Sequence, residues 1–436
     1  MNTPHAERPP EIGTAPERPA RRHGRDPGAG VPFSRSPVTL DDLLSGLLWT
    51  KLLRSASLAL NPGRLWLCSF LLVAVFALDT TWHALFGGRE PGPLVACLAD
   101  LRRPIADLVG ALFPHVQAGA WVWTPDLGAA GKAMIDLFIT VPQGMIVSPE
   151  GGLVSGLFAV VILVPVAVVL TAVCGGAVCR SVAVEFATGR SIPWTRALAF
   201  GLSRWGSLVG ALIGPLAIVW TICLLLVAAG WLMTWPLLNI LGALLFPFVL
   251  LASLAAALAM VAYVVGHMML MPAVACDGAD GFDAVQRAYA YAYGRPLRLV
   301  SYLAVLLLQG VVAFLLLASV IWLGMALAER LTGLSGTESP AGGAGGVWLD
   351  GAARRLVRFW NAIVRIVAAS YALSLYFAGS TVLYLLMRKL NDDQDPRDLW
   401  MPGLVEGAAP LMPAPAGAAG AVNAAPTGAH TDPSDD

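Results

Sequence analysis

Six long apolar runs constrain this chain more than any other feature. A helix needs about 20 predominantly apolar residues to cross roughly 30 Å of hydrocarbon. Runs of that length occur at Leu65 to Phe86, Leu153 to Val178, Ser207 to Met233, Leu237 to Met271, Leu299 to Leu327 and Ile366 to Met387. With 57% hydrophobic and only 13% charged residues, the chain has too little polar surface for a water-soluble fold. We therefore predict an all-α fold, a polytopic six-span transmembrane helix bundle.

The two ends of the chain differ from the spans in composition. Residues 1–36 are rich in Pro, Arg and Gly, and residues 401–436 are rich in Ala, Pro and Gly. Such segments bury too little apolar surface to offset the entropy of ordering, so we expect both to be disordered. The membrane domain is then 37–400.

The segment 87–150 is the longest one between two spans. It contains two amphipathic stretches, Leu94 to Phe113 and Ala129 to Ile139, with Trp121 and Trp123 between them. Tryptophan at this density is typical of the membrane interface. We expect an extracytoplasmic loop on the outer membrane surface, with a small cap over the bundle as the alternative.

Lys and Arg gather in the loops that six spans place on one side of the membrane. They are Arg54, Arg64, Arg180, Arg190, Arg196, Arg204, Arg287, Arg295, Arg298, Arg388 and Lys389, whereas the connection 234–236 has no charged residue. The positive-inside rule then puts both termini in the cytoplasm. Arg354, Arg358 and Arg365 oppose this orientation and share one helical face. They indicate an interfacial helix before span six that contacts anionic headgroups, or equally a solvated basic face.

A short amphipathic pattern recurs before three of the spans. The copies are Leu52 to Leu58, Trp194 to Phe200 and Val285 to Tyr291, each with one Arg and, about eight residues on, a basic or Pro-containing turn before the span. We expect elbow helices in the cytoplasmic headgroup layer, with Arg reaching the phosphates. The expected anionic-lipid contacts are Arg54, Arg64, Arg196, Arg204, Arg287, Arg295 and Arg298. Spans two and three, and four and five, then form hairpins around an elbow, while span six with the first elbow and span one supplies a third, circularly permuted copy.

One group of known proteins shares these motifs. The segments Met271 to Ala275, Gly281 to Tyr289, Gly294 to Pro296 and Thr381 to Lys389 resemble uncharacterised bacterial multi-span proteins similar to the membrane domain of some glycerophosphodiester phosphodiesterases. The resemblance covers roughly Val178 to Asp393. It implies a membrane fold in the bacterial inner membrane and no catalytic residues, because no catalytic domain accompanies it here.

Four polar side chains lie within the predicted spans and are candidate functional residues. Asp79 and His83 are four residues apart, so they share a helix face where an ion pair, a proton relay or two metal ligands are conceivable. Their distance from Arg64 puts them near the outer interface, where charge costs little, and this reading is favoured. We expect His267 to meet headgroups or its elbow, and Gln309 to form an interhelical hydrogen bond rather than a substrate contact.

Small residues repeat at helical spacing in two spans. Gly206, Gly210 and Gly214 in span three, and Gly152 and Gly156 in span two, predict close helix packing.

The sequence carries no phosphate-binding loop, nucleophile elbow or zinc motif, and Cys174 with Cys179 lacks the partners of a zinc site. The net charge of zero gives no reason to expect nucleic-acid binding. We expect no cofactor, no metal and no enzymatic activity. The favoured function is a membrane scaffold or lipid-interacting module, with lipids and a membrane-protein partner or second copy as partners. The alternatives are a channel or transporter for a small or lipidic solute, and a membrane enzyme that uses Asp79 and His83.

Overall fold

The computed structural model describes residues 48–86, 92–112, 115–117, 120–122, 124–140, 143, 156–235, 238–332 and 351–400. Six helices in these ranges are long and apolar enough to cross a membrane, which confirms the all-α six-span prediction. They are α3 (Pro62–Phe86), α8 (Val164–Thr188, preceded by the π-helical turn η3, Ala159–Leu163), α10 (Trp205–Leu232), α11 (Leu238–Asp277), α13 (Pro296–Thr332) and α14 (Gly351–Asp392). The two terminal segments expected to be disordered lie outside the described residues.

Short helices occupy the three predicted elbows. They are α2 (Arg54–Ala59, continuing the 3-10 turn η1, Leu48–Leu53), α9 (Trp194–Ser203) and α12 (Gly281–Gly294). Each is followed within a few residues by a spanning helix. Pro62 and Pro296 are the first residues of α3 and α13, where the missing N–H of proline costs nothing and its fixed φ suits the helix.

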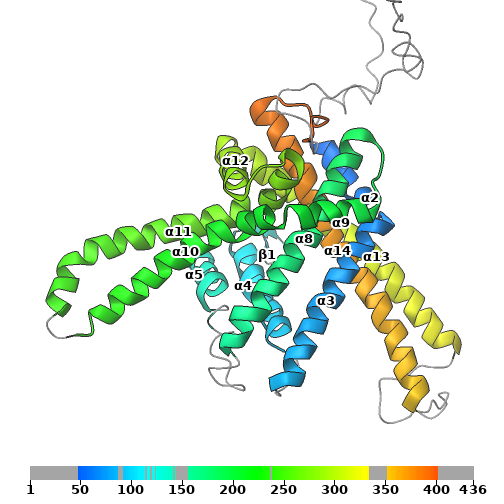
Figure 1. The fold of residues 1–436 in the computed structure, drawn as a ribbon, viewed down its shortest axis with the longest axis horizontal. Coiled ribbons are helices and arrows are strands. Elements are labelled where there is room, and N and C mark those ends of the chain that lie inside the picture. The colour runs from blue at the N-terminus through cyan, green and yellow to red at the C-terminus, as the bar shows by residue number, and fades with distance from the viewer. Residues whose placement is uncertain are drawn as a thin grey trace, which may run out of the picture. The chain divides into compact units, whose positions relative to one another are not determined.

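Three helical hairpins diverge from a common region (Figure 1). The pairs α3 with α8, α10 with α11 and α13 with α14 pack along each other. The common region, called the hub here, consists of the buried stretches 172–183 of α8, 269–276 of α11 and 377–388 of α14. These three helices contact one another there and form the main hydrophobic core.

The observed hairpins join spans one and two, three and four, and five and six, so the predicted hairpin of spans four and five is wrong, because α11 and α13 do not pack along each other. The predicted packing of span six on the first elbow and span one is present. Helix α14 packs against α2 and α3, although these lie at the opposite end of the described chain. Its Tyr371 hydroxyl donates to Ala56 O at 3.4 Å, and its Ser374 hydroxyl donates to Ala59 O at 2.8 Å.

The loop between the first two spans folds against the spans. It contains α4 (Pro93–Leu112), the antiparallel strands β1 (His115–Gln117) and β2 (Ala120–Val122), α5 (Leu127–Ile135) and the π-helical turn η2 (Asp136–Thr140). Phe138 packs on Val219 and Met260, and the Trp220 indole donates to Phe138 O at 3.1 Å. Val219 is about 20 Å along α10.

Met134 of α5 and Phe138 of η2 thus pack against α10 and α11, and the position of this loop relative to the membrane surface stays a prediction. The two helices were predicted from their amphipathic pattern, but the short strand pair was not.

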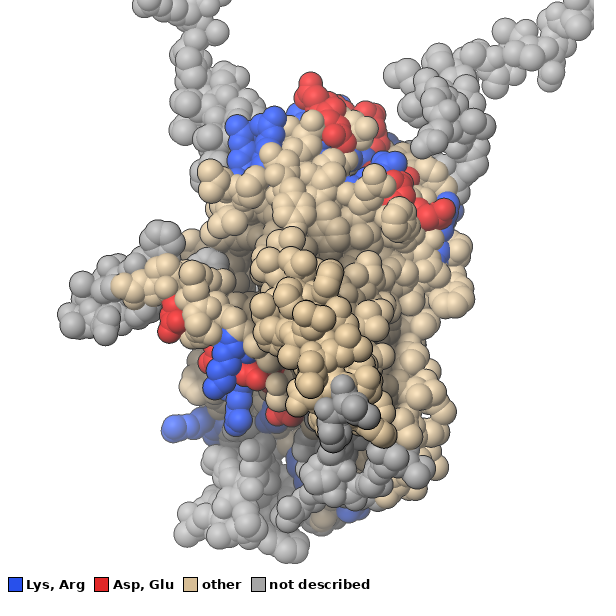
Figure 2. Space-filling model, turned by 90° about the vertical axis from the view of Figure 1, so that its left-hand side faces the viewer, with Lys and Arg blue, Asp and Glu red and all other residues tan. Residues whose placement is uncertain are grey.

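Charge is absent from the middle of the face formed by the α10–α11 hairpin (Figure 2). Neither helix carries Asp, Glu, Lys or Arg before Asp277. The helix predicted before span six is continuous with that span, since α14 runs unbroken from Gly351 to Asp392, and its contact with headgroups stays a prediction.

Candidate functional site

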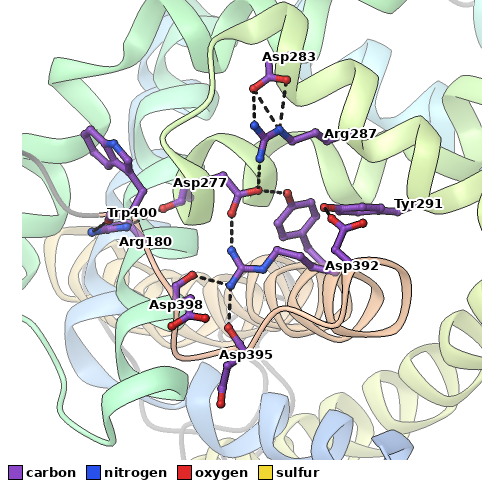
Figure 3. Close-up of polar contacts among 12 residues, drawn as sticks. Arg180, Asp277, Asp283, Arg287, Tyr291, Asp392, Asp395, Asp398 and Trp400 are labelled. Atoms are coloured by element: carbon purple, nitrogen blue, oxygen red, sulfur yellow. Dashed lines mark hydrogen bonds and ion pairs between the residues drawn. The ribbon is translucent and has the colours of Figure 1, made fainter. Parts of the chain in front are cut away.

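Each of the three helices that form the hub carries a charged residue directly after a fully buried residue. Arg180 follows Cys179 in α8, Asp277 follows Cys276 in α11, and Arg388 follows Met387 in α14. Because the three helices converge, Asp277 and Arg388 pair directly, while Arg180 lies nearby and donates to Ala275 O and Trp400 O (Figure 3).

Asp277 is the centre of a polar cluster. Its carboxylate is 5% exposed and accepts from the Arg388 guanidinium, which is 2% exposed, and from the Tyr384 hydroxyl. Arg287 Nη1 lies 3.4 Å from its second oxygen. A buried ion pair of this kind is held by the full set of hydrogen bonds around it.

Helix α12 is tied to the cluster through two side chains. Arg287 donates to Asp283, one turn earlier, at 3.1 Å, and this hydrogen bond raises the pKa of the guanidinium above its ordinary value. The Tyr291 hydroxyl donates to Asp392 at the end of α14. Burial and this carboxylate raise the pKa of Tyr291. The elbow is thus fixed to both α11 and α14.

The segment after α14, residues 393–400, folds back over the hub and is called the strap here. Asp393 has a left-handed φ of 54°, which turns the chain directly after the helix. Arg388 Nη2 donates to Asp395 O at 3.1 Å and Asp398 O at 2.6 Å. Trp400 N donates to Cys276 O at 2.9 Å.

Arg180 and Arg204 both contact the last residue of the strap. Arg180 donates to Ala275 O at 2.9 Å and Trp400 O at 2.7 Å. Its guanidinium also lies 5.2 Å from the centre of the Phe200 ring. The Arg204 guanidinium lies 4.7 Å from the Trp400 ring.

A second buried ion pair joins α3 to α8. Arg64, which is fully buried, donates to Glu185 at 2.7 Å, and to the hydroxyl and carbonyl of Ser181 at 3.0 Å each. The expected lipid contact of Arg64 is therefore wrong, because Glu185 provides its anion inside the protein.

The other predicted lipid-contacting arginines divide into two groups. Arg54, Arg196, Arg295 and Arg298 are exposed. Arg204 and Arg287 are half-buried and contact protein groups, as described above. Exposure keeps the first four available to headgroups, and their lipid contact stays a prediction.

Asp79 is buried and caps another helix. Its carboxylate accepts from Leu94 N at 2.9 Å and Val95 N at 3.4 Å, at the start of α4, where a negative charge is favourable. Gly92 makes room for it, since a Cβ there would lie 2.6 Å from the carboxylate carbon. His83 forms no ion pair with Asp79, and its buried Nδ1 has no partner among the described residues. The pair is not brought together as one site.

Gln309 forms the interhelical hydrogen bond that was predicted. Its amide donates to Leu53 O at 3.0 Å and Ser55 Oγ at 3.1 Å, which joins α13 to the first elbow. His267 does not reach its elbow. Its ring stacks between Tyr263 and Tyr376, with centroids 6.1 and 6.3 Å away.

The predicted glycine stripe is wrong for Gly206 and Gly214, since a Cβ at either would meet nothing within 4 Å. A Cβ at Gly210 would lie 3.8 Å from Gly281 Cα, an ordinary packing distance. Gly152 lies outside the described residues, and Gly156 is buried at the start of span two. Close approach of one backbone to another is found instead at Gly201 of α9, where a Cβ would lie 2.3 Å from Val173 O.

The sequence reasoning missed Asp277, Glu185, Tyr384 and Trp400. Asp277 gave a signal, because it is the first charge after a long uncharged run and closes a helix within the repeat. Glu185 and Trp400 gave none, because their partners are distant in the sequence. All six cysteines are free, and no group of three or more His, Cys, Asp or Glu is placed for a metal within the described ranges.

Two apolar cavities of about 460 Å³ each lie between neighbouring hairpins. One separates the α13–α14 hairpin from α11 and is lined by Ser55, Met268, Leu306, Gly310, Phe314 and Leu375, among others. The other separates α8 from α10 and is lined by Phe138, Val160, Val164, Trp220, Cys223 and Leu224, among others. We call them the α13 cleft and the α10 cleft.

Comparison with known proteins gives no relative: no family model, no curated protein and no solved structure matches this chain.

Proposed function

We propose that this protein is a lipid-interacting membrane scaffold whose clefts between hairpins hold phospholipid acyl chains. The observation that carries the proposal is the pair of apolar cavities, because their walls belong to helices that cross the membrane. Their volume is within the range of ordinary small-ligand sites, and in a bilayer the available apolar ligand is lipid.

The burial of the spans supports this proposal. Only 6% of the most apolar window of α13 is buried inside the protein, compared with 61% for α14. The two helices diverge from the hub together, so the protein itself leaves most of α13 to be covered from outside. Acyl chains meet that need without specific hydrogen bonds.

A transporter of a lipidic solute is the second candidate, because an acyl chain that is being transported could occupy the same clefts. A path for a polar solute has less support, since the Gln309 NH₂ group donates to Leu53 and Ser55 and the cavity beside it is apolar. An enzyme using Asp79 and His83 has less support as well, since the carboxylate of Asp79 caps α4.

We further propose the bacterial inner membrane and cytoplasmic termini, from the distribution of Lys and Arg. The hub then lies at the cytoplasmic side. The resemblance to phosphodiesterase membrane domains stays a prediction, as does a membrane-protein partner or second copy.

Lipid retention tests the proposed function. Gly310 lines the α13 cleft, and a Cβ there would lie 3.7 Å from Leu375. Gly324, on the same helix, has nothing within 4 Å and is the matched control. We expect Gly310→Leu to lower the amount of phospholipid retained after purification, measured by native mass spectrometry, and Gly324→Leu to leave it unchanged.

Photocrosslinking gives the position of the lipid. A phospholipid with a diazirine near the end of its acyl chain should label residues of the α13 cleft in the wild-type chain and lose that label in Gly310→Leu. Uniform labelling along α13, with equal retention in both variants, would contradict the proposal. Labelling of Gln309→Cys by an impermeant thiol reagent would favour a water-filled transport path instead.

A further inference from the structure

Arg180 differs from the other buried arginines in having no carboxylate partner among the described residues. Arg64, Arg180 and Arg388 are the buried arginines in the part of the chain that the structure describes. Arg64 pairs with Glu185 and Arg388 pairs with Asp277. Arg180 has two carbonyl oxygens and the face of Phe200. A buried cation with only neutral partners carries a desolvation cost that an anion would offset.

Trp400, the last residue of the strap, packs closely over this arginine. Trp400 supplies a carbonyl to Arg180 and its ring face to Arg204. Gly278 has a φ of +63°, and a Cβ there would lie 2.3 Å from the Trp400 ring. Glycine is therefore required at this position for both its conformation and the space that it leaves. A carbonyl and an aromatic face are weaker partners for two guanidinium groups than an oxyanion.

We propose that Arg180 and Arg204 form a binding site for the phosphate of an anionic phospholipid, and that Trp400 occupies this site when the strap is in place. Strap and lipid then compete, so the strap regulates how the scaffold engages anionic lipid. This inference rests on the proposed lipid-interacting function and names a headgroup site for it.

The surroundings of Arg204 favour a lipid over free phosphate. Arg204 directly precedes α10, so it stands where the chain enters the membrane. Its neighbours Leu202 and Trp205 are 57% and 52% exposed, and an acyl chain would cover them. The nearest carboxylate, on Asp280, is 85% exposed and 3.7 Å away. Such a pair is weak and leaves Arg204 able to bind another anion.

The test measures lipid binding by the full chain in neutral detergent. Native mass spectrometry would measure the binding of added short-chain phosphatidylglycerol. Phosphatidylcholine serves as the zwitterionic comparison and inorganic phosphate as the free anion. Trp400→Ala keeps the backbone carbonyl but removes the ring that contacts Arg204 and sits against Gly278. We expect it to raise the apparent affinity for phosphatidylglycerol about tenfold, the size of one cation–π contact at a partly buried site. Trp235→Ala, an exposed tryptophan at the far end of the α10–α11 hairpin, is the control.

A second substitution shows whether the arginines bind the lipid. We expect Arg204→Gln in the Trp400→Ala background to abolish the gain. Arg204 is half-buried, so this variant folds even if Arg180→Gln does not. Arg196→Gln, an exposed arginine on the same elbow, should leave the gain intact. A gain that survives Arg204→Gln would overturn the proposal, and an equal response to inorganic phosphate would overturn the assignment to lipid.

Opening of the strap gives an independent readout. Leu399 is half-buried in the strap, so a maleimide should label Leu399→Cys faster in phosphatidylglycerol than in phosphatidylcholine. Equal rates would contradict competition. The cleft variant Gly310→Leu separates the two proposals. If it lowers lipid retention while Trp400→Ala changes nothing, the headgroup site is wrong and the scaffold function stands.

Discussion

Replacement of Asp277 by Asn tests whether the hub depends on its central carboxylate. In the native chain this carboxylate accepts from Arg388, Tyr384 and Arg287. An amide of the same shape offers one acceptor oxygen and a competing NH₂ group. Arg388, at 2% exposure, is then left as a buried cation without its anion. Removal of one partner from a buried pair costs about 3–5 kcal/mol of unfolding free energy.

The assay is unfolding of the purified protein by SDS in mixed micelles, followed by circular dichroism. Asp283→Asn is the matched control, because Asp283 also pairs with Arg287 but its side chain is 44% exposed. An exposed pair contributes about 0.2–1 kcal/mol. We therefore expect Asp277→Asn to be several times more destabilising than Asp283→Asn.

A double substitution gives the sharper result. Replacing Asp277 by Leu and Arg388 by Met removes both charges, so no unpaired charge remains buried. The double variant should be more stable than either single variant, since apolar substitutes for a buried pair are often neutral. Equal stability losses for Asp277→Asn and Asp283→Asn would refute the reasoning. So would a double variant whose loss is the sum of the losses of Asp277→Leu and Arg388→Met measured alone.

Three further predictions concern other sites. Gly201→Ala should cost about 1–3 kcal/mol, because its Cβ would overlap Val173 O, whereas Gly214→Ala, in open space, should be neutral or slightly stabilising in the same SDS titration. Asp79→Ala should cost about 1 kcal/mol and speed hydrogen exchange in the first turn of α4, because it removes the cap; unchanged exchange there would contradict a capping role. Burial raises the pKa of Tyr289 from 10.0 to about 12, so stability should be full below about pH 10 and fall as pH rises toward about 12. The measurement is Tm as a function of pH, and Tyr289→Phe should make Tm fall less between about pH 10 and 12. An unchanged dependence of Tm on pH would show that this hydroxyl is not responsible.

The sequence determined the elements of this protein because their signals are local. Span length and apolarity are properties of consecutive residues, so all six spanning helices were predicted to within a few residues at most ends. The elbows, and the packing of span six on the first elbow and span one, were predicted from a repeated pattern of aromatic, Arg and Pro residues. The kind of contact that Gln309 makes, an interhelical hydrogen bond, was predicted without its partners, since a polar amide among apolar residues needs a partner.

Only the tertiary structure decided which charges are paired and which glycines are packed. Arg64 reads as a lipid contact in the sequence, yet it pairs with Glu185, 121 residues away, and Arg388 pairs with Asp277, 111 residues away. Such pairs form because the hub excludes water, which strengthens an ion pair and penalises an unpaired charge. Whether a glycine faces another backbone or open space depends on how neighbouring helices are turned, and nothing in its local sequence carries that information.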